Sequence, residues 1–148
     1  MLDSKMLITF LSTVKYDKNE IKSYIPNINY GKVVKVYDGD TITIITTLQN
    51  EGSVLSADLY KFNVRILGID TPELKSKNAV EHELGILARN SLSELIMDKV
   101  VRLENVSYDK YGRILCHVFL DKINISEWLV SKNHAVLYNG GKKVKKWC

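Results

Sequence analysis

A β-hairpin is indicated by the sequence GKVVKVYDGDTITIITT, which occupies residues 31–47. Val, Ile and Thr fill both halves of this segment, and these residue types favour strands. Between the halves, Asp38-Gly39-Asp40 has the composition of a tight turn. We therefore expect strands at residues 31–37 and 41–47, with the folded domain beginning near residue 30.

A third strand is expected at residues 58–67, after a polar loop at residues 48–56. In this strand Phe62, Val64 and Ile66 alternate with polar residues. Because successive side chains of a strand point to opposite faces, the alternation indicates that the polar residues, including Arg65, leave the face opposite the apolar set.

The rest of the chain carries one long helical pattern and two more strand patterns. Apolar residues recur at spacings of three and four over residues 79–98, as in an amphipathic helix. Strands are expected at residues 100–106 and 113–120, followed by a short helix that Ser126 caps and that buries Trp128. This α+β, mainly β pattern of five strands with two to three helices predicts a closed five-stranded barrel of the oligonucleotide-binding (OB) fold.

The first 29 residues are expected to be an extension to a domain that spans residues 30–148. Within the extension, the apolar residues 6–14 permit two interpretations: a strand or helix that packs on the domain, or the core of a secretion signal. The lack of a small-x-small cleavage pattern favours packing. Two cysteines, Cys116 and Cys148, form neither a disulfide framework nor a ligand pattern, which favours an intracellular location and leaves secretion open.

The composition is that of one soluble domain, with 148 residues of which 45% are hydrophobic and 26% charged. No apolar run approaches the roughly 20 residues of a membrane-spanning helix, so we expect no membrane association. We also expect a monomer. The net charge of +4 equals the charge of the lysines near the C-terminus, and this basic tail either tethers nucleic acid or is a solvated terminus. These lysines are Lys142, Lys143, Lys145 and Lys146.

Three polar turns fall where the expected strands begin or end. They are Asp38-Gly39-Asp40, Asp70-Thr71-Pro72-Glu73 and Asp109-Lys110-Tyr111-Gly112-Arg113. Each alone has an ordinary explanation, as a hairpin, a helix start or a β-turn. The second turn ends a run that starts at Arg65, and the third turn ends at Arg113, so two of only four arginines fall at these places. Their occurrence together favours a functional site, because loops at strand ends of a rigid barrel gather functional side chains.

Carboxylates and arginines together suit phosphodiester hydrolysis, which needs an activated water, a cation and donors for the charge that develops. Asp40 and Asp70 offer oxygen ligands to a hard cation such as Ca²⁺. Glu73 is placed to orient or deprotonate the water. Arg65 and Arg113 are suited to bidentate binding of a phosphate.

The order and spacing of the three turns, with Arg65 between the first and second, resemble the staphylococcal nuclease (thermonuclease) family over about residues 31–138. The resemblance implies an OB barrel and a Ca²⁺-dependent nuclease that cleaves DNA and RNA with little sequence preference and leaves 3′-phosphate ends. It also implies roles by position: metal ligands Asp40, Asp70 and the Thr71 carbonyl; a supporting carboxylate, Asp38; a general base, Glu73; scissile-phosphate ligands Arg65 and Arg113; and terminal-phosphate contacts Lys110 and Tyr111.

Two points of the resemblance stay open. Tyr138 corresponds either to an aromatic residue that stacks on a nucleotide base, as suits a binder of single-stranded nucleic acid, or to a tyrosine that caps the core. Mg²⁺ or Mn²⁺ is an alternative to Ca²⁺. His82, His117 and His134 are dispersed, and we assign none of them to the site.

Two other classes of protein share the expected fold. One is a catalytically silent module that binds nucleic acid or protein, and the other is a purely structural domain. Asp40, Asp70 and Glu73 speak against the binding module, since unneutralised acids would repel a phosphate ligand. The sequence therefore predicts a nuclease.

Overall fold

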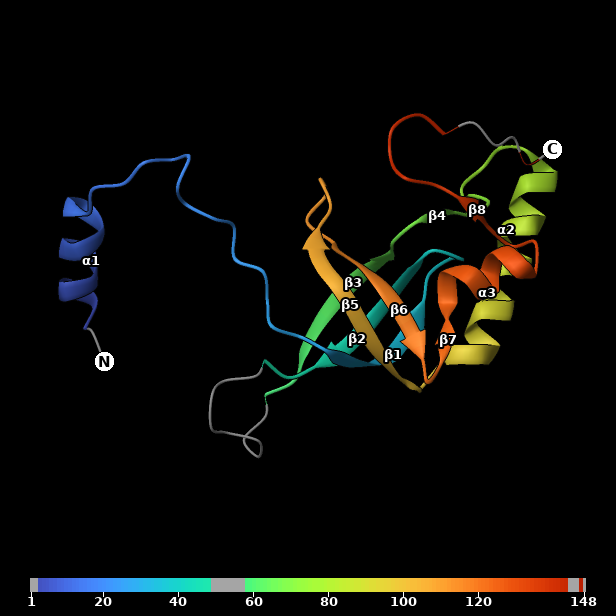
Figure 1. The fold of residues 1–148 in the computed structure, drawn as a ribbon, viewed down its shortest axis with the longest axis horizontal. Helices are drawn as coiled ribbons and strands as arrows, with labels where there is room; N and C mark the ends of the chain where they lie inside the picture. Colours follow the sequence, from blue (N-terminus) through green and yellow to red (C-terminus); the bar gives the residue numbers. More distant parts are fainter. Residues whose placement is uncertain (1–2, 49–57, 144–146, 148) are drawn as a thin grey trace.

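Five strands of the described residues close into a β-barrel in the computed structural model, which describes residues 3–48, 58–143 and 147 (Figure 1). Neighbouring strands pair antiparallel in the order β3-β2-β1-β5-β6, and a parallel pairing of β3 with β6 closes the barrel. The barrel strands are β1 (Tyr30–Val36), β2 (Thr41–Thr46), β3 (Tyr60–Ile66), β5 (Val100–Tyr108) and β6 (Ile114–Leu120). The predicted five-stranded OB barrel is confirmed. The loop expected at residues 48–56 lies, apart from Leu48, outside the described residues.

The core is built from the alternation of apolar residues that the strands carry. In β3 the side chains of Val64 and Ile66 are fully buried, while Arg65 between them leaves the other face. Cys116 of β6 is also buried in this core and is a free thiol, and burial raises its pKa to about 12. This cysteine is therefore a packing residue.

Two helices cover the barrel. In α2 (Ala79–Ile96) the residues at spacings of three and four are buried against it, and Asn78 caps the helix by accepting a hydrogen bond from the Glu81 amide. The expected helix over residues 79–98 is thus confirmed except for its last two residues. The residues of α2 that are buried against the barrel are Gly85, Ala88, Leu92 and Ile96.

The second covering helix, α3 (Ile125–Ser131), corrects one sequence expectation. Its cap is Asn124, which accepts a hydrogen bond from the Glu127 amide at 3.2 Å, and not Ser126. Ser126 lies inside the helix and donates its hydroxyl to the Leu67 carbonyl at 2.8 Å. Trp128 is half-buried and packs against the core, as expected.

Three very short strands hold the C-terminal part of the chain against the barrel. β7 (Ile123–Asn124) extends the sheet beside β6, while β4 (Ile69–Asp70) pairs antiparallel with β8 (Val136–Leu137). Beyond β8, the Tyr138 amide donates to the Gly68 carbonyl at 2.9 Å. The tail after Leu137 therefore starts beside Gly68, at the β4–β8 pair (Figure 1).

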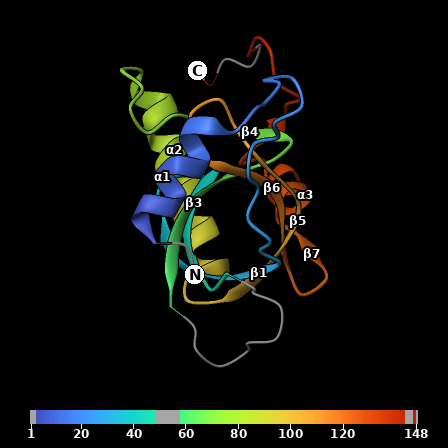
Figure 2. The ribbon, with the colours of Figure 1, turned by 90° about the vertical axis from the view of Figure 1, so that its left-hand side faces the viewer.

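The N-terminal apolar segment forms a helix, α1 (Ser4–Thr13), but it does not pack on the barrel. No side chain of this fully described helix is buried, and Ile8 and Leu11 are 64% and 60% exposed. Figure 1 shows α1 apart from the barrel, at the end of an extended connection, and Figure 2 looks at the molecule from the α1 side, with the barrel strands behind the helix. The expectation of packing was wrong because residues 14–25 run exposed and carry the helix away from the barrel.

Packed structure begins just before the first strand. Ile28 is 2% exposed and belongs to the core, and the Asn29 carbonyl accepts a hydrogen bond from the Leu103 amide at 2.8 Å. No helix within the described ranges combines the length and the apolar character needed to cross a bilayer.

Candidate active site

A cavity of about 940 Å³ opens at the end of the barrel where β4 and β8 pair, and side chains from all three polar turns line it. Asp70 and Thr71, which are 4% and 1% exposed, are not on its wall. The structure thus brings the three turns to one place. The predicted site residues on the wall are Asp38, Asp40, Arg65, Glu73, Lys110, Tyr111, Arg113 and Tyr138.

The first turn joins the second through hydrogen bonds of Asp40. The Asp40 amide donates to Asp38 Oδ1 at 3.0 Å, which holds the turn closed. Thr71 Oγ1 donates to Asp40 Oδ2 at 2.9 Å, and Thr41 Oγ1 donates to Oδ1 at 3.0 Å. A Cβ at Gly39 would lie 2.9 Å from the Thr71 side chain, so only glycine permits this close approach. Asp40 is consequently fixed in orientation.

Arg65 lies against Asp40 and is fixed by backbone carbonyls. Its Nη1 donates to the Ile66 carbonyl at 2.9 Å, and its Nη2 donates to the Ile69 carbonyl at 2.8 Å. Nη2 is also 3.4 Å from Asp40 Oδ2, and the Arg65 side chain is only 12% exposed. Because its partners come from two strands, β3 and β4, and from the first turn, this guanidinium has little freedom to move.

Negative charge is crowded at this end of the cavity. Burial, and then the neighbouring Asp40 carboxylate, raise the pKa of Asp38 from 3.8 to about 7. The more distant Glu73 carboxylate adds to the same effect. Two buried carboxylates side by side, with a third nearby, favour the binding of a cation.

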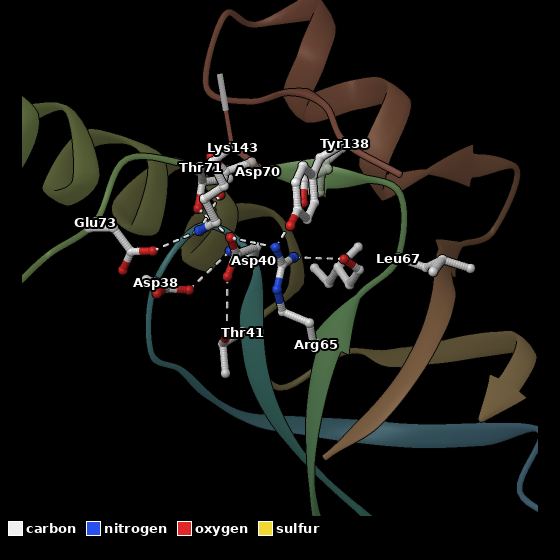
Figure 3. Close-up of polar contacts among 12 residues, drawn as sticks. Asp38, Asp40, Thr41, Arg65, Leu67, Asp70, Thr71, Glu73, Tyr138 and Lys143 are labelled. Carbon is white, nitrogen blue, oxygen red and sulfur yellow. Dashed lines mark hydrogen bonds and ion pairs between the residues drawn. The ribbon is translucent and has the colours of Figure 1, made fainter. Parts of the chain in front are cut away.

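Lys143 of the basic tail reaches into this negative region. Its ammonium lies 2.7 Å from Asp70 Oδ1 and 3.0 Å from Glu73 Oε1, as Figure 3 shows. Burial lowers the pKa of Lys143, but the contacts with Asp70 and Glu73 outweigh this and raise it, so the side chain is an ammonium. Asp70 Oδ1 is buried. Among the described residues it forms an ion pair with the Lys143 ammonium but no hydrogen bond of standard geometry.

These residues fit a hard divalent cation that the protein coordinates only in part. The carboxylates of Asp38, Asp40, Asp70 and Glu73 offer oxygen ligands, and the buried Asp70 Oδ1 has no hydrogen-bond donor of standard geometry among the described residues. Within the described ranges no cluster of three or more Asp, Glu, His or Cys side chains forms a ready-made metal cage. A cation held by Asp40, Asp70 and a backbone carbonyl would complete its shell with water and phosphate, as Ca²⁺ does readily.

The third turn is held together by Asp109. Its Oδ1 accepts from the amides of Tyr111 and Arg113 at 2.8 and 2.9 Å, and its Oδ2 accepts from Arg113 Nε at 2.6 Å. Burial raises the pKa of Asp109, but these donors outweigh it and hold the pKa below its usual range. Arg113, 32% exposed, also lies over the Tyr111 ring at 5.5 Å, and Lys110 Nζ lies 5.2 Å from the same ring.

The sequence model described as Staphylococcal nuclease homologue matches residues 63–146, more than half of the chain. This chain belongs to the staphylococcal nuclease family. The matched region contains the second and third turns. The first turn lies before it, and the hydrogen bond between Thr71 and Asp40 joins that turn to the matched region.

Several relatives that carry nuclease names are similar to this member of the staphylococcal nuclease family. An uncharacterized endonuclease of Haemophilus influenzae is 33% identical, covering 93% of this chain and 64% of that protein. The thermonuclease of Staphylococcus hyicus is 32% identical, covering 70% and 56%. Endonuclease YncB of Bacillus subtilis is 31% identical, covering 82% and 56%. The chain thus spans between 56% and 64% of the length of these relatives.

Tyr138 lies on the cavity wall, half-buried, and fixes the start of the tail. Its hydroxyl donates to the Gly141 carbonyl at 2.6 Å, and Lys143 Nζ lies 6.0 Å from its ring. The expected stacking on a nucleotide base stays a prediction. Tyr138 and Arg65 line the same cavity, and Figure 3 labels both.

Sequence reasoning missed two contributors to this site of the nuclease family. Lys143 was assigned only to a basic tail, because strands as short as β4 and β8 leave no pattern that would bring the tail to Asp70. His117 lies on the cavity wall, with a buried Nδ1 that has no hydrogen-bond partner among the described residues. His82 instead contacts the Leu74 carbonyl at 2.7 Å, as a structural residue would.

Proposed function

We propose that this protein is a metal-dependent nuclease that uses Ca²⁺, or Mg²⁺ or Mn²⁺ in its place. Its substrates are the phosphodiester bonds of DNA and RNA, which it hydrolyses with little sequence preference to leave 3′-phosphate ends. The proposal is carried by one observation: Asp40 is bound to Arg65 and Thr71 at the base of the same cavity that Glu73 lines.

The chain's own residues divide the chemistry among them. Asp40, Asp70 and the Thr71 carbonyl would hold the cation, which supplies charge to offset the phosphate and polarise it. Arg65 lines the cavity and would bind a phosphate oxygen with its remaining N–H groups, since its backbone bonds use only two of the five. Glu73, 55% exposed on its side chain, holds the attacking water and accepts its proton.

The remaining residues position the nucleic acid chain. Arg113 gives a second guanidinium for the charge that develops on the phosphate. Lys110 and Tyr111, on the same exposed turn, contact a terminal phosphate. Tyr138 stacks on a base, which favours single-stranded substrates because their bases are free to stack. We also propose that the protein acts as a monomer.

The test is an incubation of the full chain with single-stranded DNA and with RNA, in Ca²⁺ or in chelator. We expect cleavage only with the metal, products that a 3′-phosphatase converts to extendable ends, and a loss of about 10²-fold or more in kcat for Glu73→Gln. Glu94→Gln on the exposed face of α2 is the matched control and should cleave as the wild type does. A folded wild type that binds both nucleic acids but cleaves neither with any divalent cation would support the silent binding module instead.

A further inference from the structure

The tail residues 138–143, here called the tail strap, carry a lysine into the place where a cation would bind. Within the strap, Lys143 Nζ contacts Asp70 and Glu73 together, although these residues lie about 70 positions earlier in the chain. Lys143 lines the cavity and Asp70 does not. The ammonium therefore lies between the buried carboxylate and the open cavity.

The strap's own backbone aims Lys143 at this point. β8 pairs with β4, and the Tyr138 amide bonds to Gly68, so the strap starts at the site. It then turns back through Gly140 and Gly141, which have φ values of +90° and +77°, a conformation that favours glycine. The Tyr138 hydroxyl closes this turn on Gly141 at 2.6 Å. Gly140, Gly141 and Tyr138 thus produce the turn that brings Lys143 back to Asp70.

The Lys143 contact is also of a kind that can be reversed. The lysine side chain is 43% exposed and its Glu73 partner 55% exposed, and ion pairs this open contribute little to stability. Only the Asp70 end of the contact is buried, at 5% exposed. A divalent cation at Asp70 and the Lys143 ammonium would be two positive charges at the same oxygen, so both cannot occupy it.

We propose that Lys143 is an internal cation that occupies the metal position until a divalent metal and a nucleic acid phosphate displace it together. The inference rests on the proposed function and names a regulation of its site. The metal neutralises Asp70 in place of the ammonium, and the phosphate offers the released lysine a new partner. Metal and nucleic acid should then bind cooperatively, since each removes part of the cost of displacing the strap.

The first test measures metal binding without catalysis, by titrating the full chain with Ca²⁺ in a calorimeter and with luminescent Tb³⁺. We expect Lys143→Met to bind either metal about fivefold to tenfold more tightly than the wild type, as removal of a weak competing ion pair predicts. Lys142→Met removes the same charge from the neighbouring exposed position and should change the affinity less than twofold.

The second test measures the coupling with a phosphorothioate single-stranded oligonucleotide that resists cleavage. Adding it should tighten Ca²⁺ binding to the wild type by a larger factor than to Lys143→Met. Equal metal affinities of wild type, Lys143→Met and Lys142→Met, with binding abolished in Asp70→Asn, would overturn the role of Lys143 and leave the metal site standing. No metal binding to any variant, with or without the oligonucleotide, would overturn this inference and the metal dependence of the proposed function together.

Discussion

The two arginines of the site are held in different ways. Arg65 is 12% exposed and takes its partners from β3, β4 and the first turn, with Asp40 lying 25 positions away in the chain. Arg113 is 32% exposed and is held by Asp109 of its own turn, four positions earlier. The part of the site around Arg65, here called the Arg65 side, is therefore held in place by the tertiary fold. The part around Arg113, here called the Arg113 side, is a local turn that can adjust to the substrate.

The largest effect is expected for Arg65→Ala, which should break the Arg65 side. Loss of the guanidinium removes the ion pair of Asp40 and the donors to the Ile66 and Ile69 carbonyls, so we expect about 10²- to 10³-fold lower kcat and about 2–3 kcal/mol lower stability. Nuclease assays and urea unfolding measure the two quantities, with Arg89→Ala on α2 as control. A fully stable Arg65→Ala protein would contradict the view that this arginine is part of the fold.

Arg113→Ala should separate activity from stability. We expect a fall in kcat of about 10²-fold, because a charged donor is lost, but a stability change of about 1 kcal/mol or less, as for a local and half-exposed ion pair. The same two measurements apply. A stability loss as large as that of Arg65→Ala would show that the two arginines are held alike. An unchanged kcat would show that Arg113 does not contact the phosphate.

Thr71→Val tests how far the organisation of Asp40 matters by itself. The substitution keeps the shape of a side chain that is 1% exposed and removes its hydrogen bond to Asp40 Oδ2. We expect about 1 kcal/mol lower stability and about tenfold weaker Ca²⁺ binding, as is typical when a partner of a metal ligand is lost. Calorimetric titration of Ca²⁺ decides this, and an affinity equal to that of the wild type would show that Asp40 needs no such support.

The smallest effect should come from Asp109→Asn and should depend on pH. The folded-state pKa of Asp109 lies below its unfolded value, so its contribution to stability is present above about pH 4 and is lost as pH falls through the folded pKa. Between pH 6 and pH 3 the wild type should lose more stability than Asp109→Asn. Urea midpoints of both proteins across this range measure the difference, and parallel curves would show that Asp109 is not a charged acceptor.

Local patterns in the sequence predicted most of the barrel and the carboxylate cluster. The hairpin with Asp38 and Asp40 and the helix over residues 79–98 are coded by neighbouring residues, so they were recovered with their boundaries nearly correct. The N-cap of α3 was predicted wrongly as Ser126, because Asn124 and Ser126 are both good capping residues. The pairing of β7 with β6 places Asn124 at the helix start, and that pairing is a tertiary contact.

What escaped prediction depends on contacts between distant residues or on their absence. Lys143 meets Asp70 only because β4 and β8 pair, and two-residue strands leave no periodic signal. The apolar residues of α1 suggested packing, yet no surface of the barrel receives them. A hydrophobic pattern states what a segment is able to bury and does not state where.

The parallel pairing of β3 with β6 determines when the site can form during folding. It sets Arg65 opposite Leu115, so the second arginine of the site, Arg113, reaches its place only when strands about 50 residues apart in sequence have met. Such a contact of high sequence separation forms late, because the entropy of a long loop opposes it until other contacts are made. Folding and the appearance of the proposed nuclease activity should therefore coincide in time during refolding from urea, and a nascent chain that ends before residue 114 should not cleave nucleic acid.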